Sequence, residues 1–237
     1  MFQSACFFAS GILVGDESAL NFYFTNMLLS YVLGSLIFMW LAYKNKRPIL
    51  ETLQILGVIL LTAILGSKIA HALFEARGHW LSNGLIAQNF WELFQDDPWH
   101  GLRFSDPGYV FYGGLAACFF LSFFWPKMRS YADYAVPGLC LGIFLGRLGC
   151  FYTGCCYGVA GLPVQLLDAG FGLIMLCSIR KFRSFLIIYS LWRFGLEFLR
   201  ADENRGIWAL WLSTSQWIAL TILTISLKSS QMRQTRI

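Results

Sequence analysis

Charged side chains are scarce in this chain. Asp, Glu, Lys and Arg together make up only 13% of the 237 residues, whereas 57% of the residues are hydrophobic. A soluble globular domain carries about 25% charged residues, so this composition excludes an ordinary soluble protein. Apolar runs of roughly 20 residues, the length that crosses a bilayer as a helix, recur along the sequence instead. The composition therefore predicts an integral membrane protein.

The sequence also lacks a basic segment before its first apolar run, FFASGILV, and acidic residues follow that run. A cleavable signal peptide begins with a positively charged region, so this pattern is not typical of one. We expect residues 1–20 to form an interfacial segment on the outer surface. A frayed chain terminus is the alternative for the same residues.

Seven apolar runs predict seven transmembrane helices in a single all-α domain over residues 1–237. The expected helices are residues 21–43, 49–73, 108–125, 131–151, 163–179, 184–199 and 207–227. The longest connection, residues 74–107, is expected to be an outer loop. The chain is thus predicted to be a polytopic membrane protein.

Basic residues gather on one side of the expected bundle. Of the 18 Lys and Arg residues, eleven follow the first, third, fifth or seventh expected helix, and most acidic residues lie in the opposite connections. The positive-inside rule then predicts an outer N-terminus and a cytoplasmic C-terminus, with residues 228–237 as a cytoplasmic tail. The net charge of +5 is explained by attraction to anionic lipids of the inner leaflet, so no nucleic-acid partner is expected.

Two arginines interrupt the apolar runs, Arg147 in LCLGIFLGRLGCF and Arg193 in FLIIYSLWRFGLEFL. An ionised guanidinium in hydrocarbon is unfavourable by several kcal/mol, so it is normally buried against a partner or an anionic ligand. Arg193 shares one helical face with three other polar residues, Tyr189, Glu197 and Arg200. The spacings along this face are four, four and three residues. Two cations beside one acid favour an anionic ligand, and guanidinium groups match phosphate oxygens. The alternative is an internal ion pair between Arg193 and Glu197.

Three of the seven cysteines, Cys150, Cys155 and Cys156, cluster after Arg147. Three interpretations stay open. The first is small apolar packing with a disulfide, and the second is a thiol activated by Arg147 that attacks a lipid donor. The third is a metal site, but C-x4-C-C lacks the usual zinc spacing and no histidine is close in sequence. We therefore expect neither a metal nor another cofactor.

Five segments form an ordered set of motifs. They are GSKIAHAL at 66–73, FYGGL at 111–115, GRLGCFYTGCCYG at 146–158, PVQLLD at 163–168 and YSLWRFGLEFLR at 189–200. Together they resemble the motifs of bacterial prolipoprotein diacylglyceryl transferases, whose signature reads Gly-Arg-x-Gly-Asn-Phe-x-Asn-Gly-Glu-x-x-Gly. The last segment is similar to the family run Tyr-Gly-x-x-Arg-Phe-x-x-Glu-Phe-x-Arg. Any single motif is weak, whereas the ordered set is specific.

The resemblance implies a multi-pass enzyme of the bacterial inner membrane. Such an enzyme takes a diacylglyceryl group from phosphatidylglycerol and places it on the thiol of a lipoprotein cysteine at the outer face. The resemblance also implies that Arg147 and Arg193 hold the donor phosphate and stabilise the charge on the departing glycerol phosphate. Substrate binding is then expected from Gly113, Gly114, Gly154, Cys156, Gln165, Glu197 and Arg200, with Glu197 orienting Arg193.

Several family residues are replaced in this chain, and four positions bear on catalysis. Tyr112 and Leu162 stand where the family has histidines, and Cys150 replaces its asparagine. The family glutamate falls at Cys155, or at Cys156 if the alignment shifts by one residue. The pKa of a tyrosine is about 10, so Tyr112 is almost fully protonated at neutral pH and is a poor general base there. With these replacements, the expected catalytic residues are Arg147, Arg193, Tyr112, Cys150 and Cys155.

The acceptor is less defined than the lipid donor. The outer insertion that the family places between its signature and its His-Pro element shrinks here to residues 159–162. The family builds an outer head from that insertion, so its loss puts peptide recognition in question. A lipoprotein cysteine is the default acceptor, and a small hydroxyl or thiol compound is the alternative.

Two other classes of function stay open. A non-catalytic protein that binds or flips anionic lipid needs the arginines but changes no covalent bond. A membrane thiol-disulfide protein needs Cys155 and Cys156 and tolerates the loss of either arginine.

Overall fold

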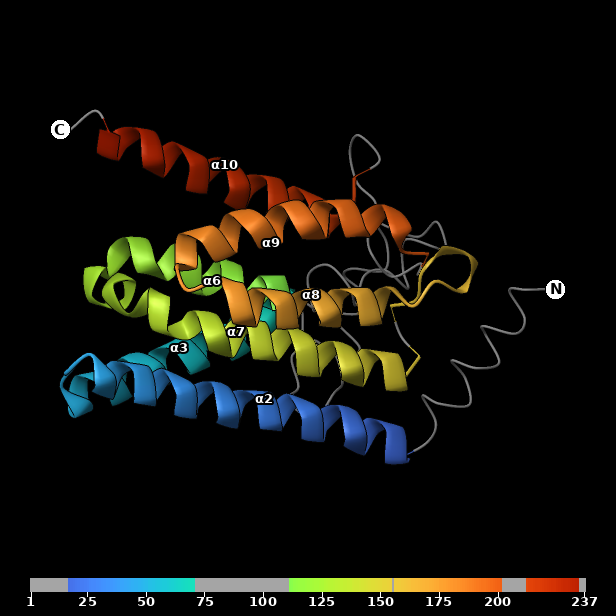
Figure 1. Ribbon diagram of the computed structural model, residues 1–237, viewed down its shortest axis with the longest axis horizontal. Coiled ribbons are helices and arrows are strands. Elements are labelled where there is room, and N and C mark those ends of the chain that lie inside the picture. The colour runs from blue at the N-terminus through green and yellow to red at the C-terminus, as the bar shows by residue number, and fades with distance from the viewer. Residues whose placement is uncertain (1–16, 71–110, 155, 202–211, 235–237) are drawn as a thin grey trace, which may run out of the picture. The chain divides into compact units, whose positions relative to one another are not determined.

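The computed structural model describes residues 17–70, 111–154, 156–201 and 212–234 (Figure 1). Every regular element within these ranges is a helix, as the sequence predicts. The α-helices are α2 (Glu17–Lys44), α3 (Ile49–Ala70), α6 (Phe111–Phe124), α7 (Pro126–Tyr152), α8 (Val164–Ser178), α9 (Phe182–Leu196) and α10 (Thr214–Gln234). Two short 3₁₀ helices are η2 (Val159–Gly161) and η3 (Glu197–Leu199). The expected outer loop, residues 74–107, lies outside the described residues.

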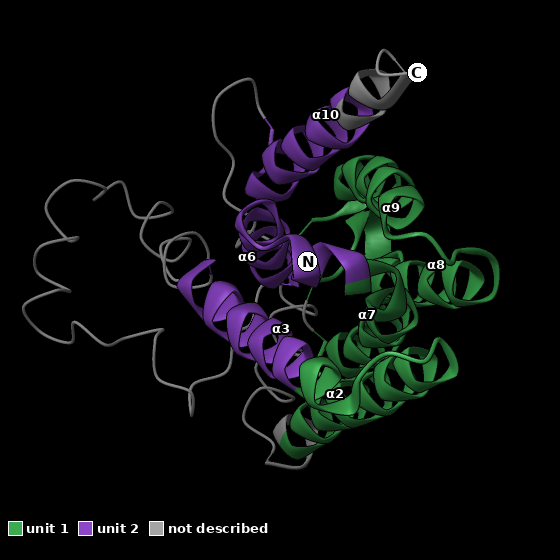
Figure 2. Ribbon diagram, turned by 90° about the vertical axis from the view of Figure 1, so that its left-hand side faces the viewer, with its two compact units in different colours: residues 1–53, 131–202 green, residues 54–130, 203–237 purple. Residues whose placement is uncertain are grey.

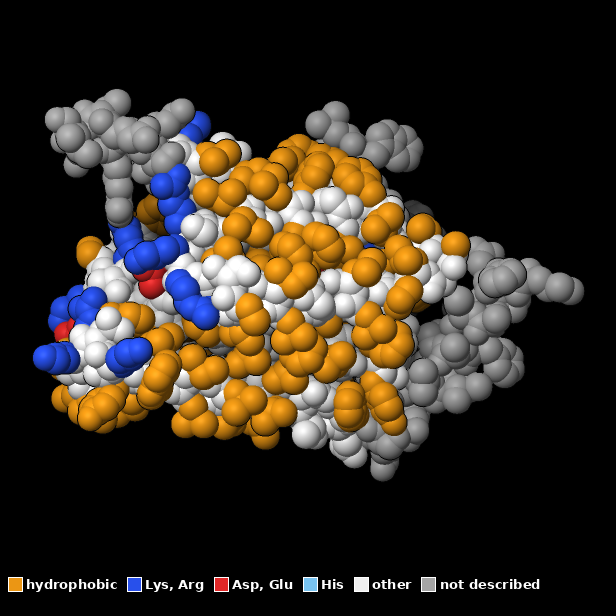
Figure 3. Space-filling model, in the orientation of Figure 1, with side chains coloured by type: hydrophobic (Ala, Val, Ile, Leu, Met, Phe, Trp, Pro, Cys, Tyr) orange, Lys and Arg blue, Asp and Glu red, His pale blue; other side chains and the backbone are white. Residues whose placement is uncertain are grey.

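Three of these helices are long and apolar enough to cross a membrane: Asn21–Lys44, Ile49–Ala70 and Pro126–Tyr152. Two more, α6 and α8, are apolar but shorter. Most side chains on the face drawn in Figure 3 are hydrophobic, as expected where lipid tails rather than water surround a protein. The all-helical architecture is therefore confirmed for the described residues, and three of its helices have the length and composition of membrane spans.

Helix α7 begins five residues before the expected start at residue 131. Pro126 stands at its first position, where the missing N–H of proline removes no helical hydrogen bond. Only Trp125 separates α6 from α7. Lys127 and Arg129, expected in a connection, therefore lie on the first turns of α7.

Helix α10 begins at Thr214, later than the expected start at residue 207. Ser213 and Gln216 explain the start, because each side chain binds the backbone N–H of the other. Gln216 Oε1 accepts from the N–H of Ser213 at 2.9 Å, and Ser213 Oγ accepts from the N–H of Gln216 at 3.2 Å. This reciprocal cap sets the first turn of α10.

The described residues group into two compact units (Figure 2). The first unit takes its residues from Met1–Leu53 and Tyr131–Asp202, and the second from Gln54–Ser130 and Glu203–Ile237. The first unit thus contains α2, most of α7, α8 and α9.

Helix α7 is the centre of packing in the first unit. A Cβ added at Gly34 of α2 would lie 3.1 Å from the Cα of Gly138 of α7, so these two backbones approach closely. A Cβ at Gly172 of α8 would lie 3.1 Å from the carbonyl oxygen of Cys140 of α7. Small residues allow such close helix contacts in membrane proteins. Helix α8 also contacts α9.

One end of α7 in the first unit collects basic side chains. Lys181 Nζ lies 3.0 Å from Asp133 Oδ2, and Arg47 Nε donates to the hydroxyl of Tyr134 at 3.3 Å. The hydrogen bond with Tyr134 raises the pKa of Arg47 above its ordinary value. Because α7 rises about 1.5 Å per residue, Arg147 lies about 20 Å further along the helix from this end.

The second unit depends on a close crossing of α3 and α6. A Cβ at Gly113 of α6 would lie 2.5 Å from the carbonyl oxygen of Gly66 of α3, and one at Gly114 would lie 2.6 Å from that of Ala63. No larger residue fits at either position without moving a backbone. Helix α10 packs against α6.

Candidate active site

The first half of the site joins α7 to α8. Arg147 Nε forms an ion pair with Asp168 Oδ2 at 2.7 Å. The side chain of Arg147 is 17% exposed, and that of Asp168 only 1%. A buried carboxylate therefore neutralises one of the two arginines that the sequence singles out.

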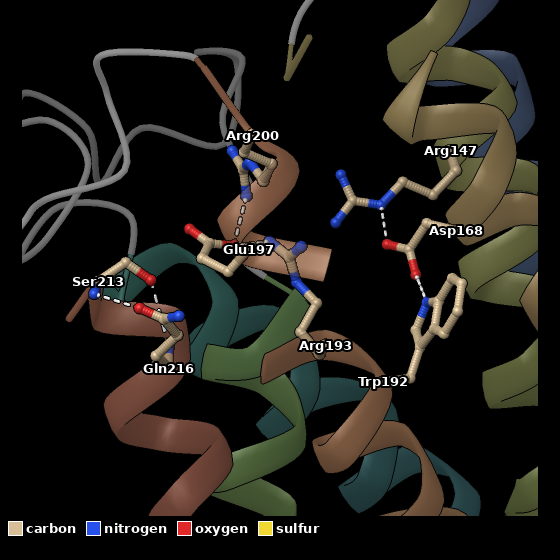
Figure 4. Close-up of polar contacts among 8 residues, drawn as sticks. All are labelled: Arg147, Asp168, Trp192, Arg193, Glu197, Arg200, Ser213 and Gln216. Atoms are coloured by element: carbon tan, nitrogen blue, oxygen red, sulfur yellow. Dashed lines mark hydrogen bonds and ion pairs between the residues drawn. The ribbon is translucent and has the colours of Figure 1, made fainter. Parts of the chain in front are cut away.

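Helix α9 also contributes to this ion pair. The indole Nε1 of Trp192 donates a hydrogen bond to Asp168 Oδ1 at 2.9 Å, so each carboxylate oxygen contacts a different helix (Figure 4). Trp192 directly precedes Arg193 in the chain. The two arginines of the site are thus linked through neighbouring positions on α9.

The second half of the site lies where α9 passes into η3. Arg193 Nη2 lies 2.9 Å from Glu197 Oε2, and Arg200 Nη1 lies 3.4 Å from the same oxygen. All three side chains are buried, with 3% of Arg193 and 1% of Glu197 exposed. The predicted helical face therefore exists, and the expected ion pair of Arg193 with Glu197 is present.

A short backbone contact holds the end of the GRLGCFYTGCCYG motif beside Arg200. Gly158 forms an isolated antiparallel bridge with Arg200, and the N–H of Ala201 donates to the carbonyl of Tyr157 at 3.0 Å. A Cβ at Gly158 would lie 2.6 Å from the carbonyl of Leu162 and 2.9 Å from that of Leu199. This glycine allows two motifs far apart in sequence to meet.

The site carries an excess of positive charge. Three guanidinium groups face two carboxylates in the described part of the first unit. Arg193 Nε and Nη1 are buried and have no hydrogen-bond acceptor among the described residues. An unsatisfied buried donor costs about 1–3 kcal/mol, and more when it is charged. The arrangement is therefore suited to an anionic ligand with several oxygens.

Tyr189 lies one helical turn before Arg193 and is buried. It is close enough to Arg147, Arg193 and Asp168 for their charges to act on its hydroxyl. Tyr189 therefore belongs to the same polar cluster within the apolar first unit.

A model of the prolipoprotein diacylglyceryl transferase family matches residues 16–229. The chain belongs to this family. It is 31% identical over 201 residues to phosphatidylglycerol–prolipoprotein diacylglyceryl transferase 2 of Clostridium perfringens, covering 69% of this chain and 71% of that protein. It is 27% identical to the transferase of the same name from Cupriavidus metallidurans, covering 83% and 84% of the two chains. For the Bordetella avium protein the identity is 26%, with 76% and 74% covered.

Membership of the diacylglyceryl transferase family confirms the resemblance seen in the five sequence motifs. With its apolar helices, the chain is a bacterial membrane protein with transferase relatives.

Two predicted binding residues lie on the elements that carry Arg147 and Asp168. Gln165 is buried on α8, three residues before Asp168 and hence on the same helical face. Gly154 follows α7 with φ +71°, a left-handed conformation that glycine adopts readily at a helix end. The local geometry accounts for glycine at 154, and its part in substrate binding stays a prediction.

The cysteine cluster lies at the end of α7. Cys150 and Cys156 are half-buried and close enough to Arg147 to interact with its charge. Cys156 has φ +58°. Cys155 lies outside the described residues. Among the described cysteines no two form a disulfide.

The Tyr-Gly-Gly segment belongs to the second unit. Tyr112 is buried in the first turn of α6, and Gly113 and Gly114 face α3. The structure gives the two glycines a packing role. The expected roles of Tyr112 in catalysis and of the glycines in binding stay predictions.

Sequence reasoning missed two residues of the site, Asp168 and Trp192. Asp168 carried a usable signal, because an acidic residue in an apolar span is as unfavourable as an arginine. Asp168 also lies three residues after Gln165, a spacing that places the two side chains on the same face of a helix. Trp192 carried no signal of its own, because tryptophan is common in membrane helices and its partner lies 24 residues away.

Proposed function

We propose that this protein transfers a diacylglyceryl group from phosphatidylglycerol to the thiol of a lipoprotein cysteine at the outer face of the bacterial inner membrane. The observation that carries this proposal is the buried guanidinium of Arg193, with two donor nitrogens, Nε and Nη1, that lack an acceptor within the described ranges. A phosphodiester supplies the charge and the oxygens that such a group requires. The names of the relatives state phosphatidylglycerol as the donor and a prolipoprotein as the acceptor.

The proposed topology is a single domain with seven membrane spans, an outer N-terminus and a cytoplasmic C-terminus. Its support is the basic cluster around Arg47 and Lys181 at one end of α7, which suits the cytoplasmic surface. Arg147 lies toward the other end of the same helix. In this orientation the arginine site opens to the outer half of the membrane.

In the proposed reaction the acceptor sulfur attacks the carbon of the diacylglyceryl group that is bonded to the phosphate oxygen. A carbon–sulfur bond forms, the carbon–oxygen bond to the phosphate breaks, and glycerol phosphate leaves with the electron pair. The leaving monoester has one more ionisable oxygen than the diester, and this oxygen balances the proton lost by the thiol. Arg147 and Arg193 stabilise the charge that develops on that oxygen, in surroundings where electrostatic interactions are strong.

Four residues are the proposed candidates for handling the acceptor proton or for transient attack on the lipid. They are Tyr112, Cys150, Cys155 and Cys156. Cys150 and Cys156 qualify because they lie near the positive charge of Arg147, which favours a thiolate. Gln165, Glu197 and Arg200 are proposed to hold the headgroup and orient Arg193.

The connection between α7 and α8 is short. Helix α7 ends at Tyr152 and α8 begins at Val164, and the only regular element described between them is η2. A lipobox peptide is therefore proposed to bind as a short extended segment rather than against a separate head.

The test uses purified full-length protein in detergent with phosphatidylglycerol and a lipobox peptide. Mass spectrometry should detect a gain of one diacylglyceryl group on the peptide. Arg193→Ala should lower the rate at least about 100-fold, the usual effect of removing a donor that stabilises developing charge. Arg183→Ala is the matched control, because Arg183 is an exposed arginine on the same helix.

Three results would contradict the proposal. Equal losses in Arg193→Ala and Arg183→Ala would point to folding rather than chemistry. Lipid retention without any covalent product would favour a carrier of anionic lipid. Turnover of the lipid with an unmodified peptide would leave the donor correct and the acceptor wrong.

A further inference from the structure

We infer that Trp192 and Asp168 are positioning residues that hold Arg147 in the orientation in which it receives the lipid phosphate, an inference that rests on the proposed function. The contacts run from Trp192 Nε1 to Asp168 Oδ1 at 2.9 Å and from Asp168 Oδ2 to Arg147 Nε at 2.7 Å. Each link joins a different pair of helices, α9 with α8 and α8 with α7. The orientation of Arg147 is therefore set by residues outside its own helix.

The geometry of the ion pair determines which part of Arg147 is available. Asp168 contacts Nε, on one edge of the guanidinium. Figure 4 shows the two terminal nitrogens of Arg147 pointing away from Asp168, toward the side on which Arg193 and Glu197 lie. These two nitrogens form the fork that best matches two oxygens of a phosphate. A contact through Nε leaves both terminal nitrogens clear of Asp168, and Arg147 also shares a hydrogen bond with Tyr189 of the same polar cluster.

Trp192 prevents the competing arrangement. Asp168 is 1% exposed, so both of its oxygens require donors from the protein. Without the indole N–H, the carboxylate is free to rotate and bind Arg147 with both oxygens, the bidentate geometry that arginine and carboxylate favour. That rotation would occupy a terminal nitrogen of Arg147. The indole N–H thus reserves the fork for the ligand.

The indole is itself held in place. Its ring stacks on Phe171 of α8 with centroids 4.1 Å apart and planes 11° from parallel. Phe171 lies three residues after Asp168, so the ring and the carboxylate that fix the indole come from one face of α8. Because Trp192 precedes Arg193, the same turn of α9 carries one arginine and positions the other.

Trp192→Phe is the variant that tests this inference, because phenylalanine keeps an aromatic ring against Phe171 and removes only the N–H. Transfer to the lipobox peptide and retention of phosphatidylglycerol in native mass spectra should both fall about 10-fold, the value of one hydrogen bond to a charged group. Trp217→Phe on α10 removes a partly exposed indole and serves as the control. Its turnover and lipid retention should match those of the wild type.

A double-mutant comparison separates positioning from packing. In an Arg147→Ala background, Trp192→Phe should cause no further loss of lipid retention, because its effect acts through Arg147. A packing role predicts the same 10-fold loss in both backgrounds. Asp168→Asn should resemble Trp192→Phe, and Asp168→Glu should recover part of the retention.

The outcomes distinguish this inference from the proposed function. Wild-type protein that retains phosphatidylglycerol but transfers nothing contradicts the transferase reaction, and retention alone then tests the role of Trp192. If Trp192→Phe retains the lipid and turns over at the wild-type level, the inference is overturned while the reaction stays intact. Equal losses with and without Arg147 overturn it as well.

Discussion

Arg193 meets Glu197 through a single nitrogen, Nη2, which lies 2.9 Å from Glu197 Oε2. The same oxygen lies 3.4 Å from Arg200 Nη1, so one buried carboxylate serves two guanidinium groups. Because the contact uses one nitrogen only, the other two nitrogens of Arg193, Nε and Nη1, lack an acceptor among the described residues and can bind another partner. Glu197 therefore both holds the cation in place and leaves it able to bind an anion.

Replacement of Glu197 by Gln should lower the melting temperature of the protein in detergent by several degrees. It removes the carboxylate charge between two buried cations, and breaking a buried pair typically costs about 3–5 kcal/mol. Lys181→Ala is the control, because Lys181 pairs with Asp133 while 76% exposed. Such surface pairs contribute about 0–1 kcal/mol. Similar melting temperatures in the two variants would contradict this account.

Gly113→Ala should destabilise the crossing of α3 with α6. The added Cβ would lie 2.5 Å from the carbonyl oxygen of Gly66, so one backbone has to move. Gly57→Ala on α3 is the matched control, since a Cβ there meets no atom within 4 Å. Thermal unfolding should show a loss of about 1–3 kcal/mol for Gly113→Ala and no loss for Gly57→Ala. A larger loss of stability in Gly57→Ala than in Gly113→Ala would contradict the close approach of α3 and α6.

Ser213→Ala should destabilise the start of α10. The substitution removes the hydroxyl that accepts the N–H of Gln216, and loss of such a cap costs about 0.5–2 kcal/mol. Thr221→Ala, which removes an exposed hydroxyl from the same helix, should have a smaller effect. Hydrogen exchange at the first turn of α10 checks the prediction directly. Unchanged exchange there in Ser213→Ala would reject the cap.

If a thiol acts as base or nucleophile, joint replacement of Cys150, Cys155 and Cys156 by Ser should lower transfer to the lipobox peptide by about 100-fold. Loss of a positioned catalytic group has an effect of this size. The mass-spectrometric transfer assay measures this. Cys177→Ser, on an exposed position of α8, is the control. Full activity in the triple variant would assign the three thiols to packing alone.

The helical architecture was predictable because its causes are local. Each apolar run is long enough to require a helix in lipid, whatever the rest of the chain does. The expected positions of α2 and α8 agree with the structure to within a few residues. The starts of α7 and α10 were less accurate, since Pro126 and the Ser213–Gln216 cap act on a few atoms that apolar periodicity does not register.

The site was predictable only in part. The face shared by Tyr189, Arg193 and Glu197 follows from helical spacing, because residues three or four apart must lie together. The pairing of Arg147 with Asp168 does not follow from spacing, because the two residues belong to different helices.

Local sequence information is enough to assign the membrane class, the order of the helices, the family and the two arginines. These properties depend on composition, on helical period and on short motifs, all of which a linear chain displays. Only the packed structure shows that Asp168 neutralises Arg147 and which nitrogens of the two guanidinium groups contact a carboxylate. Those outcomes depend on how α7, α8 and α9 pack, and contacts between helices are set by shape and burial that no single segment contains.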